Sequence, residues 1–282
     1  MSRMERRPFG YTQRPVSVIG QGTWYIDHGD QARAVAALRT GLDLGMNHID
    51  TAEMYGDAEL VVGEAIAGRR EEVFLVSKVL PSNASLPGTL AACERSLTRL
   101  GTDRLDCYLL HWRGSIPLEE TVDAFDRLQR DGKILSWGVS NFDIDDLEEL
   151  SGVTPDGQCA CNQVLYHLKE RAIEHAVIPW CERQGVAVVA YSPFGHNDFP
   201  SPRTPGGRLL QQIADAHGAT PRQVALRFLT RLPVLFAIPK ASNPEHAAEN
   251  AGAGALRLSS AELAAIDAAF PRGPRPRSLP MI

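Results

Sequence analysis

Three successive apolar runs of the sequence end at ionisable side chains, and a tyrosine follows the first of them. Asp50 ends the run around Ile49, Lys78 and His111 end the next two runs, and Tyr55 lies five residues beyond Asp50. If these runs are neighbouring strands, a carboxylate, an ammonium group, an imidazole and a phenol can reach one place. Side chains of these types can exchange protons with a bound substrate. We therefore predict that the four residues form a catalytic group.

Each of these residues also has an ordinary structural explanation when it is taken alone. An aspartate at a strand end can cap the following turn, a lysine can be solvated, and a histidine after two leucines can pack in the core. Tyr55 can pack at the start of a helix. The shared position of the first three at the ends of neighbouring runs, with the tyrosine close by, favours the catalytic interpretation.

The elements that must position these residues alternate along the chain. Eight apolar runs have strand character: Ser17–Ile19, Asn47–Ile49, Val73–Val76, Leu105–Leu110, Ile134–Val139, Cys159–Val164, Val186–Ala190 and Val234–Ile238. Stretches with apolar residues at helical spacing lie between or after them: Asp30–Leu44, Leu86–Leu100, Leu118–Arg130, Ile173–Gln184, Pro221–Arg231 and Ser259–Phe270. This alternation of strand and helix indicates parallel pairing of the strands.

Eight strand–helix repeats without a Ser- or Gly-rich linker favour a closed barrel over an open doubly wound sheet. The dinucleotide fingerprint of an open sheet is also incomplete, because Tyr25 stands where the last glycine after Gly20-Gln21-Gly22 would be. Size alone would equally allow two small domains in 282 residues. We predict an α/β fold, a (β/α)8 TIM barrel forming a single domain over residues 1–282, with its active site at the carboxyl ends of the strands.

Composition excludes several other classes of protein. The net charge is −5 with basic residues scattered among acids, so we expect no nucleic-acid partner. No signal peptide or membrane-spanning run is present, and we expect a cytoplasmic protein. The five cysteines lack CxxC spacing, which argues against disulfides and against a zinc site. We therefore expect no metal.

Longer motifs resemble those of the aldo-keto reductase family. The likeness spans nearly the whole chain and is carried, in order, by Gly45 to Gly56, Ser77-Lys78, Leu109 to Trp112, Gly138 to Phe142 and Ile238 to Lys240. The resemblance implies an enzyme that reduces aldehydes or ketones to alcohols by hydride transfer from NAD(P)H. In that reaction Tyr55 would be the proton donor, because the alkoxide must be protonated as it forms.

The resemblance also gives the other three residues their roles. A tyrosine of ordinary pKa near 10 needs an adjacent cation to approach working pH, and Lys78 would supply it. Asp50 would hold Lys78 charged and oriented. His111 would be neutral and would orient the carbonyl oxygen of the substrate.

The second half of the chain resembles the part of the family that binds the cofactor. Ser140, Asn141 and Gln163 would bind the nicotinamide carboxamide, and Tyr191 would stack on the nicotinamide ring. The loop from Ser192 through Phe194 to Gly195 would approach the pyrophosphate, where glycine allows close contact. The remaining cofactor-binding residues implied by the resemblance are Gly22, Thr23, Trp24, Asp50, Ile238, Lys240, Ser242, His246, Glu249 and Asn250.

The sequence departs from the family pattern at the adenosine end of this site. Ala241 stands where many NADPH-specific members carry serine, and His246 stands where they carry arginine. A neutral histidine is a weaker partner for a phosphate than an arginine. Lys240 still favours NADPH, and NADH stays an alternative cofactor.

Aromatic residues at strand ends are expected to line the substrate pocket, together with two members of the catalytic group: Trp24, Tyr25, Tyr55, His111 and Trp112. Only Trp112 to Ile116 precede Pro117, and the tail from Pro271 to Ile282 can form at most a short flap, so we expect an open site. The segment His196 to Gly207 is the remaining loop that could contact substrate. The resemblance is to small bacterial-type reductases of aldehydes, α-dicarbonyls such as methylglyoxal, and keto sugars, and it favours a monomer.

Two other functions compete with this interpretation. Aldo-keto reductase-like subunits of potassium channels bind nucleotide, regulate a partner and can retain the same four residues. They carry an N-terminal extension, whereas here the first predicted strand begins near Ser17. A barrel with metal-assisted chemistry would need His, Asp or Glu at the later strand ends, which instead offer Ser140, Asn141, Gln163 and Tyr191.

Overall fold

The computed structural model describes residues 4–154 and 158–282, and its centre is a barrel of parallel strands. The strands follow one another in chain order around the sheet: β3 (Gln21–Gly22), β4 (His48–Asp50), β5 (Phe74–Val79), β6 (Cys107–Leu110), β7 (Trp137–Ser140), β8 (Cys159–Leu165), β9 (Ala187–Tyr191) and β10 (Leu235–Ala237). Parallel bridges from Ile19 to Ala237 and from Gly22 to Lys240 join the first and last strands. The barrel is therefore closed, and the predicted (β/α)8 fold is confirmed.

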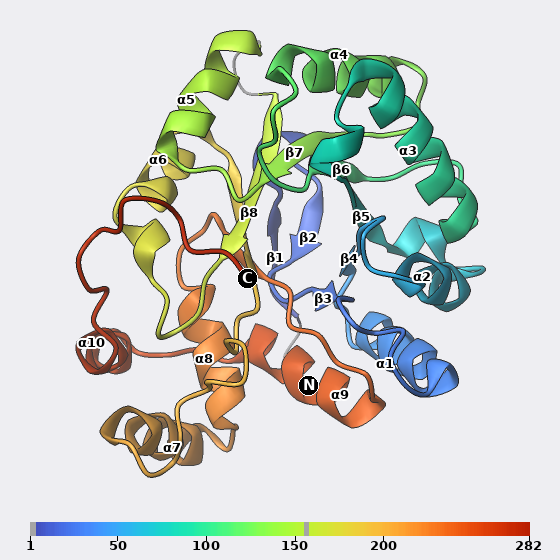
Figure 1. Cartoon of the computed structure of the whole chain (residues 1–282). Coiled ribbons are helices and arrows are strands. Elements are labelled where there is room, and N and C mark those ends of the chain that lie inside the picture. The colour runs from blue at the N-terminus through green and yellow to red at the C-terminus, as the bar shows by residue number, and fades with distance from the viewer. Residues whose placement is uncertain (1–3, 155–157) are drawn as a thin grey trace.

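Helices surround this ring of strands (Figure 1). They are α1 (Gln31–Asp43), α2 (Ala58–Ile66), α3 (Leu86–Leu100), α4 (Leu118–Arg130), α5 (Ile144–Val153), α6 (Val177–Gln184), α7 (Pro205–His217), α8 (Pro221–Leu229), α9 (Pro244–Gly252) and α10 (Ser260–Ala269). Many begin at a side chain that accepts a backbone N–H of the first turn, as Thr220 does for Gln223 and Asn243 for His246. Because such a cap sets the first residue of its helix, it also sets where the preceding loop ends.

A hairpin closes the amino end of the barrel. Its strands are β1 (Arg6–Pro8) and β2 (Pro15–Ser17), and they cross the centre of the ring in Figure 1. Phe9 enters the barrel, with its ring centroid 4.7 Å from that of Phe74 and 5.1 Å from that of Phe236. Because aromatic and aliphatic side chains fill this end, a ligand can enter only from the opposite end.

The predicted first strand needs a correction. Ser17 belongs to the hairpin strand β2, and the first barrel strand β3 starts only at Gln21. Val18 and Ile19 are buried beside Ala237, so their apolar character is explained by the core without a regular strand. An apolar run identifies buried backbone, but it does not say which neighbour that backbone pairs with.

The other seven predicted strands are present, with ends that differ by a few residues. The prediction of eight strand–helix repeats gave no bounds for four of the helices: α2, α5, α7 and α9. Helix α7 begins at Pro205, inside the segment His196 to Gly207 that was expected to be a loop. The predicted helix Ile173–Gln184 is a short 3-10 turn followed by α6 from Val177. Among the described residues, no helix combines the length and apolar character needed to cross a membrane.

Candidate active site

The four predicted catalytic side chains meet at the carboxyl end of the barrel. Lys78 Nζ donates to Asp50 Oδ1 at 2.5 Å and to the carbonyl oxygen of Thr51 at 2.9 Å. The same Nζ lies 3.4 Å from the Tyr55 hydroxyl, which lies 3.5 Å from His111 Nε2. The Lys78 side chain is completely buried, and that of Asp50 is 2% exposed. A buried ion pair is thus connected to a phenol and an imidazole.

Strand register and one tight turn create this arrangement. Asp50 lies opposite Val76 in β4 and β5, so that Lys78 on β5 projects just beyond Asp50 at the same edge. Tyr55 follows β4 in a turn that includes Gly56, whose φ of +53° suits glycine. The carboxylate of Glu53 holds the next loop by accepting the backbone N–H of Leu80 at 2.7 Å. The tyrosine is therefore placed by the chain that connects β4 to α2.

Burial governs the protonation of the four groups. Burial raises the pKa of Tyr55, and the nearby ammonium group of Lys78 opposes that rise without cancelling it. Burial also lowers the pKa of Lys78, but Asp50 and Tyr55 outweigh it and the net pKa is raised. Burial, with a smaller effect of Lys78, lowers the pKa of His111 to about 2. The site thus contains a protonated phenol, an ammonium group and a neutral imidazole at neutral pH.

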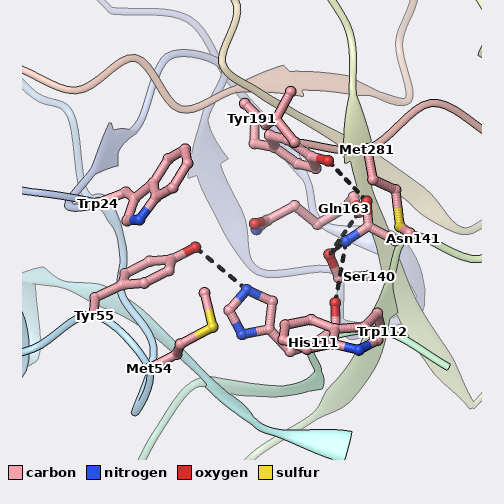
Figure 2. A pocket seen from close by; sticks show the side chains of 11 residues that line it. Trp24, Met54, Tyr55, His111, Trp112, Ser140, Asn141, Gln163, Tyr191 and Met281 are labelled. Carbon is pink, nitrogen blue, oxygen red and sulfur yellow. Dashed lines mark hydrogen bonds between the residues drawn. The ribbon is translucent and has the colours of Figure 1, made fainter. Parts of the chain in front are cut away.

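One cavity of about 330 Å³ joins these groups to the amides predicted to bind the cofactor. Tyr191 Oη donates to Asn141 Oδ1 at 2.9 Å, and Asn141 Nδ2 donates to the backbone carbonyl oxygen of His111 and to Ser140 Oγ, both at 3.2 Å. Figure 2 shows these side chains facing Tyr55 across the cavity. Gln163 Nε2 donates to Asp50 Oδ2 at 2.7 Å. An aromatic face bordered by two amides fits a flat ring that carries a carboxamide.

A second cavity of about 340 Å³ continues from the first along β3 and the loop after β9. The cavities share Trp24, Tyr55, Gln163 and Tyr191. The remaining predicted residues on its walls are Gly22, Thr23, Asp50, Ser192, Phe194, Gly195, Ile238 and Lys240. Gly195 has a φ of +73°, and a Cβ atom there would lie 1.7 Å from Asp198 Oδ1. The backbone therefore passes close to this cleft at a position that requires glycine.

The predicted adenosine residues lie beyond these walls. Ser242, His246, Glu249 and Asn250 do not line either cavity. Asn250 is buried, and Glu249 Oε1 accepts the hydroxyl of Thr220 at 2.7 Å. His246 is exposed, and its Nδ1 lies 3.1 Å from Asn243 Nδ2. The structure thus brings together the residues predicted to bind nicotinamide and pyrophosphate. The residues predicted to bind adenosine lie outside these cavities, on α9 and the loop before it.

Three pocket residues were missed by the sequence analysis. Met54, Met281 and Ile282 line the cavity that contains Tyr55 and His111, and both methionine side chains approach it in Figure 2. Met54 could have been found, because it precedes Tyr55. No local pattern points to the last two residues, which reach the cavity only because the tail runs back over the barrel. Tyr25, predicted to line the substrate pocket, lies on the second cavity and stacks on Trp24 with centroids 4.5 Å apart.

The sequence model of the Aldo/keto reductase family matches residues 18–270. The chain belongs to this family. It is 48% identical over 268 residues to methylglyoxal reductase YeaE of Escherichia coli (strain K12), with 94% of each chain covered. It is 34% identical to the glyoxal reductase of Bacillus subtilis (strain 168), covering 89% of this chain and 87% of the relative.

Solved structures agree with this assignment. An aldo/keto reductase from Klebsiella pneumoniae, crystallised in complex with NADP and acetate, superimposes with a TM-score of 0.90 at 46% identity. The match covers 99% of this chain and all of the Klebsiella chain. This aldo/keto reductase is accordingly an oxidoreductase of carbonyl compounds that uses a nicotinamide cofactor.

Proposed function

We propose that this aldo/keto reductase reduces small aldehydes and α-dicarbonyls such as methylglyoxal, with NADPH as the hydride donor. One observation carries the proposal: the hydroxyl of Tyr55 lies 3.4 Å from the ammonium group of Lys78 and 3.5 Å from the imidazole of His111, at a cavity bordered by Asn141 and Tyr191. A proton donor and a surface for a flat carboxamide ring therefore share one cavity.

The four polar residues have different roles in protonating the carbonyl oxygen. NADPH, when bound, supplies the hydride. Tyr55 donates its proton to the oxygen as negative charge develops there. Lys78 stabilises the phenolate left behind, and Asp50 keeps Lys78 charged through the 2.5 Å contact. His111, neutral because its pKa is about 2, orients the carbonyl oxygen through Nε2.

The cofactor's reactive ring is held by residues of the barrel's second half. Tyr191 stacks against it, and the side chains of Ser140, Asn141 and Gln163 bind its carboxamide. The backbone around Gly195 and the wall at Gly22 would accommodate the pyrophosphate, because both positions line the cleft and neither adds a side chain to it. The 2.7 Å bond from Gln163 Nε2 to Asp50 supports this assignment, since it fixes the amide beside the reaction centre.

The pocket favours short substrates. Trp24, Trp112, Met54 and Met281 give it apolar walls, and its volume of about 330 Å³ also has to accommodate the nicotinamide ring. A three-carbon dicarbonyl fits the remaining space more readily than a steroid. The names of the relatives from Escherichia coli and Bacillus subtilis, methylglyoxal and glyoxal reductase, support the same class. Keto sugars are a third candidate class to include in the assay.

The decisive experiment is a cofactor-oxidation assay with purified protein. We expect NADPH absorbance to fall in the presence of methylglyoxal, with weaker turnover of an aromatic aldehyde or a keto sugar. NADH in a parallel assay measures the preference for the 2′-phosphate. If no carbonyl in this panel is reduced while NADPH binds tightly, the proposed substrate class is wrong and a nucleotide-dependent regulatory role takes its place.

The chain is further proposed to act as a single-domain monomer in the cytoplasm. The five cysteines are free and buried, as in proteins of reducing compartments. Among the described residues, the exposed large apolar side chains away from the two cavities are few, namely Tyr11, Leu44, Leu60 and Leu135. Light scattering on the purified protein should give the mass of one chain, 30.8 kDa. A mass of two chains or more would contradict the monomer.

A further inference from the structure

We propose that Arg222 binds the adenosine 2′-phosphate of NADPH and supplies the positive charge that this chain lacks at His246. The inference rests on the proposed use of NADPH. It assigns cofactor preference to a residue outside the motifs that carry the family resemblance.

Arg222 is the second residue of α8, and two aromatic rings hold its guanidinium group beside the cofactor cleft. The guanidinium carbon lies 5.6 Å from the centroid of the Phe194 ring and 5.2 Å from that of Phe199. These two rings pack edge to face at 5.8 Å. Phe194 itself lines the cleft together with Lys240. Since an arginine over an aromatic face is attracted to it, the charge is held next to the cleft wall.

The start of α8 is also bound to the helix that carries the adenosine residues. Thr220 Oγ1 donates to Glu249 Oε1 at 2.7 Å, and Gln223 Nε2 donates to the Glu249 carbonyl oxygen at 2.7 Å. Glu249 lies about one helical turn after His246 on α9. Arg222 lies between the two residues that make these bonds. Its backbone is therefore fixed beside α9, the helix that carries three of the residues predicted to bind adenosine.

The charges around this point leave Arg222 available for a phosphate. Among residues 4–154 and 158–282, it forms no ion pair with a carboxylate, and neither does Lys240. By contrast, Arg33 on α1 is paired with Glu245 at 3.4 Å. His246 uses Nδ1 in its contact with Asn243, so only Nε2 of its ring is left for a ligand. Arginine presents a fork of N–H donors that matches a phosphate, and it stays charged at all working pH values.

A rival explanation is that the guanidinium group stacks on the adenine ring, which NADPH and NADH share. The two roles differ in what they discriminate. A phosphate contact strengthens only the binding of the 2′-phosphorylated nucleotide, whereas stacking strengthens the binding of both nucleotides equally.

Calorimetry with two adenosine fragments separates these roles without any turnover. We expect Arg222→Met to weaken binding of adenosine 2′,5′-bisphosphate roughly tenfold and to leave binding of adenosine 5′-monophosphate unchanged. The matched control is Arg208→Met on the neighbouring helix α7, an exposed arginine whose Nη1 donates to the Arg203 carbonyl oxygen. It removes the same charge and should change neither affinity.

Steady-state kinetics provide the second measurement. In Arg222→Met we expect KM for NADPH to rise roughly tenfold, with kcat and KM for NADH unchanged. Equal losses for both cofactors, or for both fragments, would assign Arg222 to adenine stacking and overturn the phosphate contact. Unchanged affinities would overturn it as well. If the unaltered protein binds neither fragment, the proposed use of NADPH fails together with this inference. If it binds the fragments but reduces none of the carbonyl compounds, only the proposed substrate class fails.

Discussion

A tyrosine, a carboxylate and two basic side chains come together at two places in this protein. One is the candidate active site of Tyr55, Asp50, Lys78 and His111. The other lies between β8, α8 and α10 and comprises Tyr166, Glu174, Arg171 and Arg231; we call it the arginine network. The two places have similar chemical composition, but their hydrogen bonding differs.

The side chains of the arginine network are fully hydrogen-bonded to one another and to their neighbours. Tyr166 Oη donates to Glu174 Oε1 at 2.5 Å and accepts from Arg231 Nη1 at 2.7 Å. Glu174 also accepts two bonds of 2.7 Å from Arg171, which is almost fully buried. Burial would raise the pKa of Glu174, but the bonds from Arg171 and Tyr166 outweigh it and lower the pKa to about 2. Each polar group here has a partner within the protein, as buried charges require.

The candidate active site leaves its tyrosine loosely bonded. The contacts of Tyr55 Oη with Lys78 Nζ and His111 Nε2 are 3.4 and 3.5 Å, and His111 Nδ1 has no partner among the described residues. The short hydrogen bonds of this site belong to the ion pair, in which Lys78 donates to Asp50 and to the Thr51 carbonyl oxygen and Gln163 donates to Asp50. The comparison indicates that the protein fixes the charges at this site and leaves the Tyr55 hydroxyl, the proposed proton donor, able to bond to a substrate.

The largest expected effect comes from removing one hydroxyl at each place. Tyr55→Phe should lower kcat by about 10³-fold, because it deletes the proton donor while keeping the ring. Its melting temperature and its affinity for NADPH should stay near those of the unaltered protein. Tyr166→Phe should behave in the opposite way, with a lower melting temperature and unchanged kcat. Near-normal turnover in Tyr55→Phe would show that Tyr55 is not the proton donor, and the two places would then not differ in function.

Breaking the arginine network should lower stability rather than activity. Glu174→Gln leaves Arg171 and Arg231 without their shared counter-charge, and we expect a loss of about 3 kcal/mol in the free energy of unfolding. Denaturant titration measures it, and kcat of the folded fraction should be unchanged. A stability close to that of the unaltered protein would show that the network adds little to folding.

A smaller effect is expected where the two places are connected by the C-terminal tail. Arg171 Nη1 donates to the carbonyl oxygen of Phe270, and the tail that follows ends with Met281 and Ile282 on the pocket wall. Met281→Ala should raise KM for an aromatic aldehyde about fivefold, through the loss of about 1 kcal/mol of apolar contact, and should affect methylglyoxal less. Met281→Leu retains the apolar volume and is the control. Equal effects on both substrates would show that the tail does not contact the larger one.

The smallest expected effect on activity is the response of kcat to pH. Tyr55 has a raised pKa and His111 a pKa of about 2, so neither changes protonation between pH 5 and 8. The stabilisation from Glu174 is complete above its ordinary pKa of about 4.5 and is lost as pH falls toward about 2. We expect kcat for reduction to be nearly constant from pH 5 to 8. The melting temperature should fall as pH drops from about 6.5 toward 5, because burial lowers the pKa of His48 to about 4 and that of His111 to about 2, so both take up protons only when the protein unfolds. A bell-shaped rate profile in that window would contradict the assigned protonation states.

Much of the fold could be predicted because its signals are local. Seven strands and the helices α1, α3, α4, α8 and α10 have clear apolar patterns. Helix α9 was missed because its run of Ala, Glu and Asn carries little apolar periodicity, and α7 because Gly206 and Gly207 look like loop residues. The first strand was misplaced because Ser17 belongs to the N-terminal hairpin, where it pairs with Arg6. The helices were missed where the local apolar pattern is weak, and the strand was misplaced because an apolar run does not identify its pairing partner.

The sequence by itself determined the candidate catalytic set, since Asp50, Lys78 and His111 each follow an apolar run and parallel strands of a barrel end on one face. Tertiary structure alone decided what surrounds that set. The tail brings Met281 to the pocket wall, and α8 brings Arg222 beside Phe194, although in each case the contacting residues share neither a motif nor a secondary-structure element. The physical reason is that side-chain contacts between separate elements depend on packing geometry, which no local periodicity encodes.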